Sequence, residues 1–556
     1  MAFGVAAAAA AEGAAWSCGV RGQPVEETYA REEFLAEESV SFEGLGLRPE
    51  VVAALSAAGF PRPASTQAAA AGPLLAGHNL VLAAETGSGK TLAYLAPLLS
   101  RLLQRRADAV AAAEAGDDED RQALDAILVL CPNAALCQQV VAFSDALRGP
   151  DGAPLVRAAH VATTSPPPRE VPDLVAATPA GLITATQNYG PFFGWEWTRA
   201  GVMARMRAVV IDEADQLLTG GYERDCRRVL DALREGDRAR KAGAVCAELR
   251  ISPDAFQDLP RHLRRAAYEG GAQALKEAGF VPPGEFLWDA DPAAAAPAAP
   301  VWGAGLGSEG DDPERGRSRS AYDRTWRRQY VYVAATLPAE GGRSVANDLK
   351  KLQPDAVWVS APRLHAALRN VRHAWRPVDE GSWRSTLQEV VGRDAEVARG
   401  RGRTLVFAAS VAAADAAAAA LADAGLEPLL YHRGVHADQR AAALDAMRSG
   451  EGVVLVATDA AARGIDIPAV THVVQADFAA SAIDFLHRVG RTGRAGAAGR
   501  VTSLYGPLQA VLAQALRAAV EAGEPVEGAF SRKRSFAKKL KRYGRYVPRG
   551  RTAEQG

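Results

Sequence analysis

Cysteine is scarce in this sequence and follows no pattern. The 556 residues include 5 cysteines, and no two of them form a CxxC pair. Structural zinc sites and disulfide frameworks both need paired or regularly spaced cysteines. The sequence therefore argues against both kinds of stabilisation and favours a reducing compartment.

Long apolar runs and net charge are also missing. The longest apolar stretches are alanine-rich or interrupted by charge, whereas a membrane-spanning helix needs about 18 or more apolar residues in a row. We therefore expect no membrane association. Lys and Arg number 64 against 65 Asp and Glu, a net charge of -1, so any polyanionic partner must be bound by local basic patches.

The sequence does contain a regular alternation of β-rich and helical stretches. Hydrophobic residues make up 48% of the chain, enough for sizeable cores, and the length predicts at least two large domains. β-rich runs alternate with helical stretches over about residues 41–231, and a second series runs from Thr404–Phe407 to His472–Gln475, a pattern typical of βαβ units on parallel sheets. We predict an α/β fold with two tandem parallel-sheet domains.

Two further segments differ in composition from these domains. Residues 1–40 are alanine-rich and then acidic, and we predict an N-terminal extension that is a candidate transit peptide, although such peptides usually have more Arg and Ser. Residues 233–325 form a large insertion in the first domain, with charged helical patches followed by a stretch that we expect to be flexible. The insertion is either a tolerated surface excursion, which we favour, or a partner-binding element.

The end of the chain is a basic tail at residues 526–556. Ten Lys or Arg residues lie between Phe530 and Arg551, interleaved with four aromatic residues. Basic side chains neutralise phosphates, and aromatic rings stack on unpaired bases. We interpret the tail as RNA-binding, with a solubilising or nuclear-targeting segment as the alternative.

A glycine-rich segment, Thr86–Thr91, follows the β-rich run Asn79–Ala83 and precedes the helical stretch Leu92–Leu103. Its glycines let backbone N–H groups close round phosphates, and the helix N-terminus adds the positive end of its dipole. Lys90 would reach the outer phosphates, and the Thr91 hydroxyl can bind Mg²⁺. We therefore predict a phosphate-binding loop here.

Two later segments supply charges for phosphate chemistry. Asp212 and Glu213 follow an apolar run, at the strand end where ligands bind in open α/β sheets, and they suit the tasks of holding Mg²⁺ and activating water. In the second domain, Arg491 and Arg494 are spaced to lie on one helix face. They could both reach a phosphate held by the first domain and stabilise the charge that develops on transfer.

These segments, in this order, resemble the DEAD-box family of ATP-dependent RNA helicases, which implies two RecA-like domains: a helicase ATP-binding domain at 41–361 and a helicase C-terminal domain at 373–525. The resemblance assigns catalysis to Lys90, Asp212, Glu213, Arg491 and Arg494, and Mg²⁺ binding to Thr91 and Asp212. It places Phe60 on the adenine ring, Gln67 at its edge and Asp466 on the ribose. The implied ATP-binding set is Phe60, Gln67, Thr86, Gly87, Ser88, Gly89, Lys90, Thr91 and Asp466.

The resemblance also implies an RNA-binding set and a coupling set. The RNA-binding residues would be Pro132, Thr178, Pro179 and Thr458, and the residues that couple hydrolysis to strand separation would be Asp215, Thr336 and His487. Two departures bear on these roles. Ala134 and Ala135 replace the charged pair usual in the family, which predicts a weaker grip on RNA. Ala334 replaces a serine whose hydroxyl links to the residue equivalent to Asp215, which puts the coupling in question.

The function that the resemblance implies is an ATP-dependent RNA helicase. It would bind ATP and single-stranded RNA between its two lobes and locally unwind or remodel structured RNA, and we expect a monomer. The alternative is an ATP-gated RNA clamp or assembly scaffold with little unwinding activity. Residues 233–325 are the candidate contact for protein partners. Segments such as Asp355–Ser360 further resemble a plastid-directed plant and algal subgroup, which implies organellar ribosome or RNA maturation in the chloroplast, with nucleus or cytoplasm as alternatives.

One aromatic cluster lies outside these motifs. It consists of Tyr189, Phe192, Phe193, Trp195 and Trp197. Such a cluster could be a base-stacking platform, but aromatic residues this close in sequence commonly fix a loop onto its core. We expect them to pack within the first domain.

Overall fold

The computed structural model describes residues 34–526 apart from short gaps and one long one. The gaps are 115–124, 164–165, 281–326, 338–344, 362–363, 369, 393–401, 451, 460–466, 468–469 and 495–496. Residues 1–33 of the N-terminal extension, residues 527–556 of the basic tail, Asp466 and the latter half of the insertion therefore lie outside the described residues.

The first domain is built on a seven-stranded sheet with the order β3-β4-β2-β5-β6-β1-β7, and every strand pair in it is parallel. Most strands are buried along their whole length, as expected for a parallel sheet covered on both faces. The strands are β1 (Leu80–Ala83), β2 (Ala126–Leu130), β3 (Ala158–Val161), β4 (Leu174–Ala177), β5 (Met206–Ile211), β6 (Gln329–Ala334) and β7 (Val357–Ser360).

Helices cover both faces of this sheet and bury two separate apolar clusters against it. One face carries α3 (Pro49–Ala57), α4 (Ser65–Leu75), α5 (Lys90–Glu114) and α6 (Ala134–Ala146). The other carries α7 (Pro179–Asn188), α9 (Arg199–Arg205), α10 (Ala214–Leu217), α11 (Glu223–Leu249) and α14 (Val345–Leu352). None of the helices that the structure describes is both long and apolar enough to cross a bilayer.

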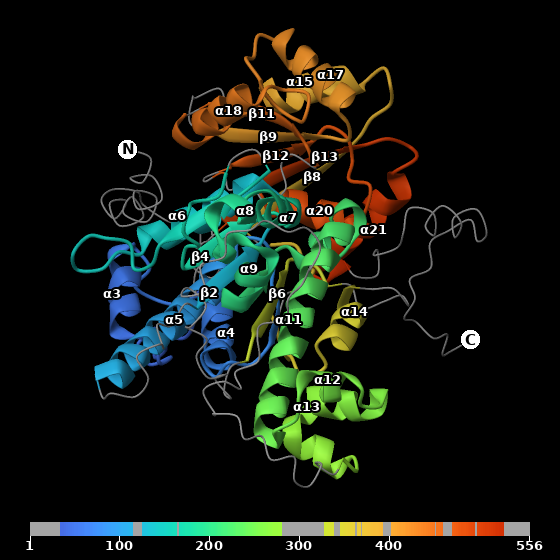
Figure 1. The fold of residues 1–556 in the computed structure, drawn as a ribbon. Helices are drawn as coiled ribbons and strands as arrows, with labels where there is room; N and C mark the ends of the chain where they lie inside the picture. The colour runs from blue at the N-terminus through green and yellow to red at the C-terminus, as the bar shows by residue number, and fades with distance from the viewer. Residues whose placement is uncertain are drawn as a thin grey trace, which may run out of the picture.

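The second domain repeats the plan with a six-stranded parallel sheet in the order β10-β11-β9-β12-β13-β8. Its strands are β8 (Val371–Pro377), β9 (Arg403–Ala408), β10 (Leu429–Tyr431), β11 (Val453–Thr458), β12 (His472–Gln475) and β13 (Gly499–Tyr505). Its helices are α15 (Trp383–Gly392), α17 (Val411–Ala422), α18 (Ala437–Ser449), α20 (Ala482–Val489) and α21 (Ala510–Ala522). Two parallel-sheet domains in tandem confirm the predicted fold class (Figure 1).

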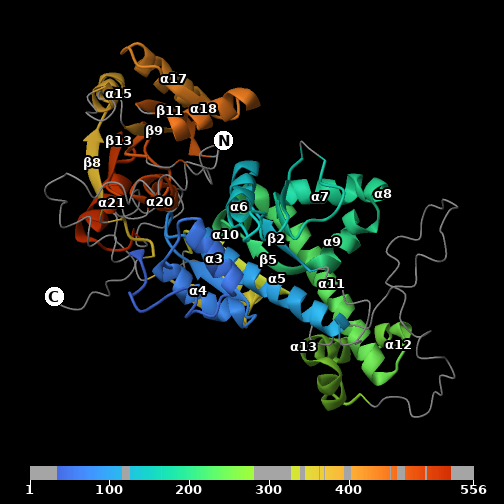
Figure 2. The same cartoon turned by 90° about the vertical axis from the view of Figure 1, so that its left-hand side faces the viewer.

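The described part of the insertion is a helical subdomain and not a loop. Helix α11 runs unbroken past position 233, and α12 (Pro253–Gln257) and α13 (Arg261–Glu277) pack against its C-terminal half. This subdomain has its own small core, in which Phe256 and Leu275 are fully buried. It extends from the first domain on the side away from the second domain (Figures 1 and 2).

A buried arginine ties this helical subdomain to the sheet. The Arg328 guanidinium donates to Asp237 of α11 at 2.8 Å, and Tyr330 on β6 donates its hydroxyl to the same carboxylate at 2.7 Å. Because the Arg328 side chain is only 1% exposed, its charge needs this partner. Helix α11 is thereby fixed to the strand that ends at Ala334.

The aromatic cluster divides into a buried and an exposed half. Trp197 is fully buried and donates its indole N–H to the carbonyl of Arg169 at 3.1 Å, and Phe193 packs on the core and stacks with Tyr189. The expectation of packing is wrong for Phe192 and Trp195, which are 81% and 54% exposed. The tight turn from α8 (Gly190–Phe193) into the 3₁₀ helix η1 (Trp195–Trp197) turns these two rings outward.

An aromatic cluster in the second domain encloses an uncharged histidine. His373 on β8 stacks with Trp375, their ring centroids 6.1 Å apart, and lies 6.0 Å from the ring of Phe485 on α20. Neither ring nitrogen has a hydrogen-bond partner among the described residues. Burial lowers the pKa of His373 to about 4, so the native domain holds this ring neutral.

We predict that this histidine makes the second domain sensitive to acid. In the unfolded chain the ring binds a proton near its ordinary pKa of about 6.5. Below that pH the unfolded state therefore binds more protons than the folded state, and the stability of the domain decreases as the pH is lowered. His373→Phe keeps the ring stacking and removes the titration. The wild-type protein should lose about 2 kcal/mol more stability than the variant between about pH 7 and about pH 5.

The measurement is urea unfolding of both proteins, monitored by tryptophan fluorescence, to which the neighbouring Trp375 contributes. Equal losses of stability in the two proteins would show that His373 is protonated in the folded domain.

Candidate functional site between the two domains

The glycine-rich loop forms a turn between β1 and α5. Gly87 and Gly89 have φ values of 86° and 78°, in the left-handed region where a side chain would be strained. Helix α5 begins at Lys90, so its N-terminal N–H groups face the inside of the loop. The turn is therefore shaped to surround an anion.

Lys90 lies folded against this loop. Its ammonium donates to the carbonyls of Ala84 at 2.8 Å and Glu85 at 2.7 Å. Burial lowers the pKa of Lys90, and the neighbouring charges of Glu213 and Asp212 oppose that shift. The lysine and the acidic segment thus share one electrostatic site.

Gln67 and Phe60 precede the loop in sequence, and one of them touches it. Gln67 on α4 is buried and donates its side-chain amide to the carbonyl of Gly89 at 3.3 Å. Phe60 is half-buried and packs on the core, its ring centroid 6.5 Å from that of Phe143. The structure therefore brings Gln67 directly to the phosphate-binding loop.

Asp212 follows β5 and lies beside the start of α5. Tyr94 donates its hydroxyl to Asp212 Oδ2 at 3.0 Å, and the same hydroxyl interacts with the side chain of Thr91. Burial, helped by the charge of Glu213, raises the pKa of Asp212 to about 6. A buried carboxylate and a hydroxyl gathered at one point form an oxygen-donor set of the kind that Mg²⁺ prefers.

Glu213 is held in an unusual backbone conformation. Its φ of 52° and ψ of 49° lie in the left-handed region, which is uncommon for a residue with a side chain. The buried carboxylate accepts a hydrogen bond from the side-chain amide of Gln216 at 3.1 Å. This strained turn directs Glu213 toward the second domain, where Nδ1 of His487 lies 4.0 Å from its carboxylate.

Asp215 receives donors from both domains. Its Oδ2 accepts hydrogen bonds from the hydroxyl and the backbone N–H of Thr336, which follows β6, and from Nε2 of His487 on α20 at 3.2 Å. Burial alone would raise the pKa of Asp215, but the bonds from His487 and Thr336 outweigh burial and lower it. These three residues form the coupling network.

The Ala334 departure does not remove the hydroxyl partner of Asp215. Ala334 is the last residue of β6, and the donating hydroxyl comes from Thr336, two residues later. The expectation that Asp215 lacks a hydroxyl link because of Ala334 is therefore wrong, since the turn after β6 brings Thr336 to the carboxylate.

The arginine-bearing segment packs directly on the phosphate-binding loop. A Cβ added to Gly87 would lie 3.1 Å from Cγ of Arg494, and one added to Gly490 would lie 1.4 Å from Oγ1 of Thr86. Arg491 is 5% exposed and donates to the carbonyl of His487. Arg494 therefore lies at the domain interface next to the loop, and Arg491 is buried directly after Gly490, which touches Thr86.

Comparison with known proteins identifies the family. A family model described as DEAD/DEAH box helicase matches residues 64–247, and one described as helicase conserved C-terminal domain matches residues 385–496. The chain is 37% identical over 536 residues to DEAD-box ATP-dependent RNA helicase 22 of Oryza sativa subsp. japonica, covering 92% of this chain and 85% of the relative. This chain belongs to the DEAD-box family of ATP-dependent RNA helicases.

Further comparisons agree. DEAD-box ATP-dependent RNA helicase 22 of Arabidopsis thaliana is 37% identical over 523 residues, covering 93% of this chain and 86% of the relative. Two solved structures share the fold at low identity. DEAD-box helicase Mss116 bound to ssRNA and UDP-BeF has a TM-score of 0.58 at 16% identity, covering 88% of this chain and 79% of that one. S. cerevisiae Dbp5 bound to RNA and ADP BeF3 has a TM-score of 0.56 at 18% identity, covering 90% and 98%.

The residues that the DEAD-box resemblance assigned to RNA lie at carboxyl ends of strands. Pro132 follows β2 by two residues, Thr178 and Pro179 follow β4, and Thr458 ends β11. Thr178 is the N-cap of α7, and its hydroxyl accepts from the backbone N–H of Gly181 at 3.1 Å. Ala135 lies in the first turn of α6, at the position of one residue of the family's charged pair.

Two residues that support this DEAD-box site were not predicted from the sequence. Tyr94 orients Asp212, as described above. Arg488 is 1% exposed, and its guanidinium forms two hydrogen bonds with the carboxylate of Asp459, at 2.6 Å and 2.7 Å. It thereby fixes α20 to the end of β11 and orients the helix that carries His487. Its place three residues before Arg491, the same spacing that separates Arg491 from Arg494, was the only sequence signal for it.

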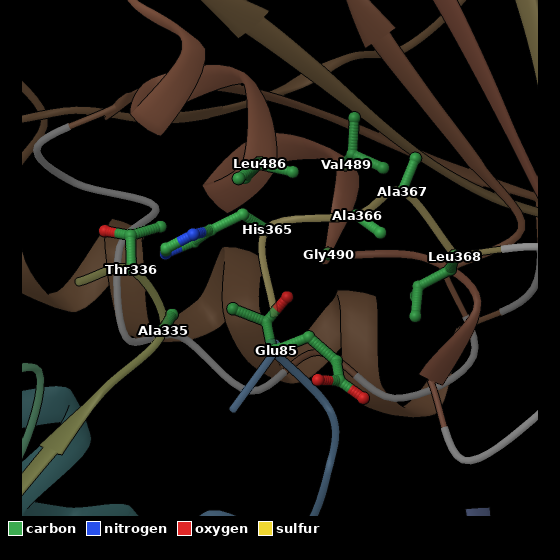
Figure 3. A pocket seen from close by; sticks show the side chains of 11 residues that line it. Glu85, Ala335, Thr336, His365, Ala366, Ala367, Leu368, Leu486, Val489 and Gly490 are labelled. Atoms are coloured by element: carbon green, nitrogen blue, oxygen red, sulfur yellow. The ribbon is translucent and has the colours of Figure 1, made fainter. Parts of the chain in front are cut away.

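A small pocket lies between the phosphate-binding loop and α20 (Figure 3). Both domains and the linker between them contribute to its wall. The lining residues are Glu85, Thr86, Ala335, Thr336, His365, Ala366, Ala367, Leu368, Leu486, Val489 and Gly490.

We predict that Gly490→Ala prevents the two domains from closing. The added Cβ would overlap the Thr86 hydroxyl, and Thr86 cannot withdraw without deforming the loop. Each domain should still fold, whereas RNA-stimulated ATP hydrolysis should fall by about tenfold or more in kcat/KM.

The control is Gly392→Ala, because an added Cβ there meets no described atom within 4 Å. Steady-state hydrolysis with saturating RNA measures the effect. A Gly490→Ala enzyme as active as the control would show that this close contact is not part of the working state.

Proposed function

We propose that this protein hydrolyses ATP in response to RNA and uses the closure of its two domains to unwind or remodel short structured segments of RNA. The observation that carries the proposal is the coupling network. The buried carboxylate of Asp215 has its hydrogen-bond donors in Thr336 of its own domain and His487 of the other. Full stabilisation of that charge therefore requires the two domains to meet.

The nucleotide roles follow from the positions of the side chains. N–H groups of the loop and Lys90 would hold the phosphates, with Phe60 and Gln67 toward the base. Thr91 and Asp212 would hold Mg²⁺, which supplies charge neutralisation when bound. Glu213 would orient the attacking water. The solved relatives named above were bound to nucleotide analogues, which supports ATP as the ligand.

Arg491 and Arg494 would complete this nucleotide site from the second domain. Arginine side chains stabilise the negative charge that develops during phosphoryl transfer. Because Arg494 lies against the phosphate-binding loop only while the domains are together, hydrolysis would depend on closure.

RNA is the proposed second ligand, and it would lie across both domains. Thr178, Pro179 and Thr458 lie at helix starts or strand ends that can contact a phosphate backbone. The basic tail, which lies outside the described residues apart from Val526, would add contacts that are independent of base sequence. RNA and ATP would then each favour the closed state and so strengthen the binding of the other.

The alternative, an ATP-gated RNA clamp with little unwinding, is less favoured. Its two sequence arguments were Ala334 and the uncharged pair at Ala134 and Ala135. The first argument fails because Thr336 supplies the hydroxyl. The second still holds and would weaken the grip on RNA without affecting the coupling network.

We further propose a role in organellar ribosome or RNA maturation, with the protein in the chloroplast. The support is the resemblance of its segments to the plastid-directed subgroup and the plant origin of two relatives. The helical subdomain of α11 to α13 is the proposed contact for protein partners, because it extends away from the RNA-binding edge and has a core of its own.

The decisive experiment compares Thr336→Val with Ala334→Ser in the full chain. We expect the wild-type protein to show RNA-stimulated hydrolysis together with unwinding of a short duplex. Thr336→Val removes one donor from a buried carboxylate and should slow unwinding by about tenfold, with KM for ATP changed less than about twofold. Ala334→Ser should match the wild-type protein because Asp215 already has its hydroxyl partner.

Glu213→Gln serves as the reference that lacks hydrolysis. In the presence of ATP this variant should remain bound to RNA. It should therefore show no further duplex unwinding once it has bound. RNA-stimulated hydrolysis without any unwinding in the wild-type protein would favour the clamp. A large gain from Ala334→Ser would show that the Thr336 link is insufficient.

A further inference from the structure

The linker between the two domains contains a buried histidine that no motif includes. The linker starts against the first sheet, where the N–H of Ala361 donates to the carbonyl of Ala83 at 2.8 Å. Leu364 packs on the apolar cluster of the first domain and Leu368 on that of the second. The chain therefore passes from one domain to the other within these few residues, and His365 lies at the crossing.

The backbone of His365 adopts a conformation that is unfavourable for a residue with a side chain. Its φ is 68°, in the left-handed region, and its side chain is buried, with the residue 2% exposed. A residue with a side chain keeps such a conformation only where its surroundings enforce it, and such residues cluster at functional sites. The contacts of His365 show what enforces it.

Those contacts connect three separate segments. The Nε2 atom of His365 accepts a hydrogen bond from the backbone N–H of Leu337 at 2.9 Å. Its carbonyl accepts from the N–H of Val526 at 2.9 Å, and Val526 is the first residue of the basic tail and the last that the structure describes. The linker, the segment after β6 and the root of the tail therefore meet at this one residue.

Leu337 directly follows Thr336 of the coupling network. Thr336 donates its own N–H and its hydroxyl to Asp215, and the next N–H along the chain donates to His365. Two successive backbone donors thus fix this segment to two different parts of the chain, the acidic segment and the linker. The imidazole of His365 extends toward Thr336 across one end of the interdomain pocket (Figure 3).

We propose that His365 is a positioning residue that couples the linker to the Thr336–Asp215 contact. When the domains close, Leu368 and His365 move with the linker, and the bond to Leu337 presents Thr336 to Asp215. His365 acts through the backbone and does not need to touch ATP or RNA. This inference rests on the proposed function, since it concerns how closure is converted into hydrolysis.

The role predicts a specific kinetic signature. Binding of ATP to the phosphate-binding loop does not involve Leu337, so loss of the imidazole should leave KM for ATP unchanged. It should lower kcat in the presence of RNA, because the closed state would form with Thr336 misplaced. A role confined to folding would instead lower thermal stability and leave kcat per folded molecule unchanged.

The test compares His365→Gly with His365→Asn in the full chain. Both replacements tolerate the left-handed conformation. The asparagine oxygen lies one bond closer to the backbone than Nε2 of histidine and does not reach the Leu337 N–H, so neither replacement restores this hydrogen bond. We expect both variants to lose about tenfold in RNA-stimulated kcat at constant KM. Duplex unwinding should fall in parallel.

A second pair restores the acceptor in one of its members. Glutamine and leucine are both strained at this φ, but only the glutamine oxygen reaches as far as Nε2, so His365→Gln should be several times faster than His365→Leu. Equal rates of the folded glutamine and leucine variants, a wild-type kcat in His365→Gly, or a change in KM alone would overturn the inference. A wild-type protein without RNA-stimulated hydrolysis would instead refute the proposed function itself.

Discussion

A buried carboxylate whose hydrogen-bond donors come from two different domains is the constraint on which the rest of this site depends. Asp215 is 8% exposed and cannot be solvated by bulk water. A charge in such a position is stable only when nearby donors replace the lost water. Thr336 and His487 provide that replacement at Oδ2, whereas Oδ1 has no hydrogen-bond partner among the described residues. The relative position of the two domains is therefore tied to the electrostatics of one side chain.

The parallel sheets explain how residues so far apart in sequence reach this carboxylate. In a parallel sheet the carboxyl ends of all strands lie at one edge, and the phosphate-binding loop, the acidic segment and Thr336 follow β1, β5 and β6 there. The second domain presents α20 to the same edge, held in orientation by Arg488. Phosphate binding, hydrolysis and domain closure consequently share one small volume.

Much of this site could be predicted from short segments of the sequence. The loop at Thr86–Thr91 is recognisable because its glycines and lysine are contiguous and lie between a strand and a helix. Asp212 and Glu213 are recognisable because they end an apolar strand. The two-domain parallel fold followed from the alternation of β-rich and helical stretches, and the family resemblance assigned Asp215 and His487 to one network.

The remaining features depend on contacts between residues distant in the sequence. Composition indicated helical patches after position 233 but gave no sign that α11 would continue from the domain into them, because that continuity depends on the buried pair of Arg328 and Asp237, 91 positions apart. The resemblance placed Thr336 in the coupling set, but Ala334 still suggested a lost hydroxyl, because only the folded turn after β6 shows that the Thr336 hydroxyl itself reaches Asp215. His365 lies in a linker without any motif, and only its backbone conformation and its bond to Leu337 reveal it.

The most direct test of this account is the distance between the two domains, measured by fluorescence transfer between dyes on Asp151→Cys and Glu427→Cys. Both positions are exposed, the described native cysteines are buried, and Cys18 would be replaced by Ser. The account predicts a closed, high-transfer state that forms when an ATP analogue and RNA are both present and that Asp215→Asn fails to reach. Full closure of the Asp215→Asn protein would contradict the central role given to this carboxylate.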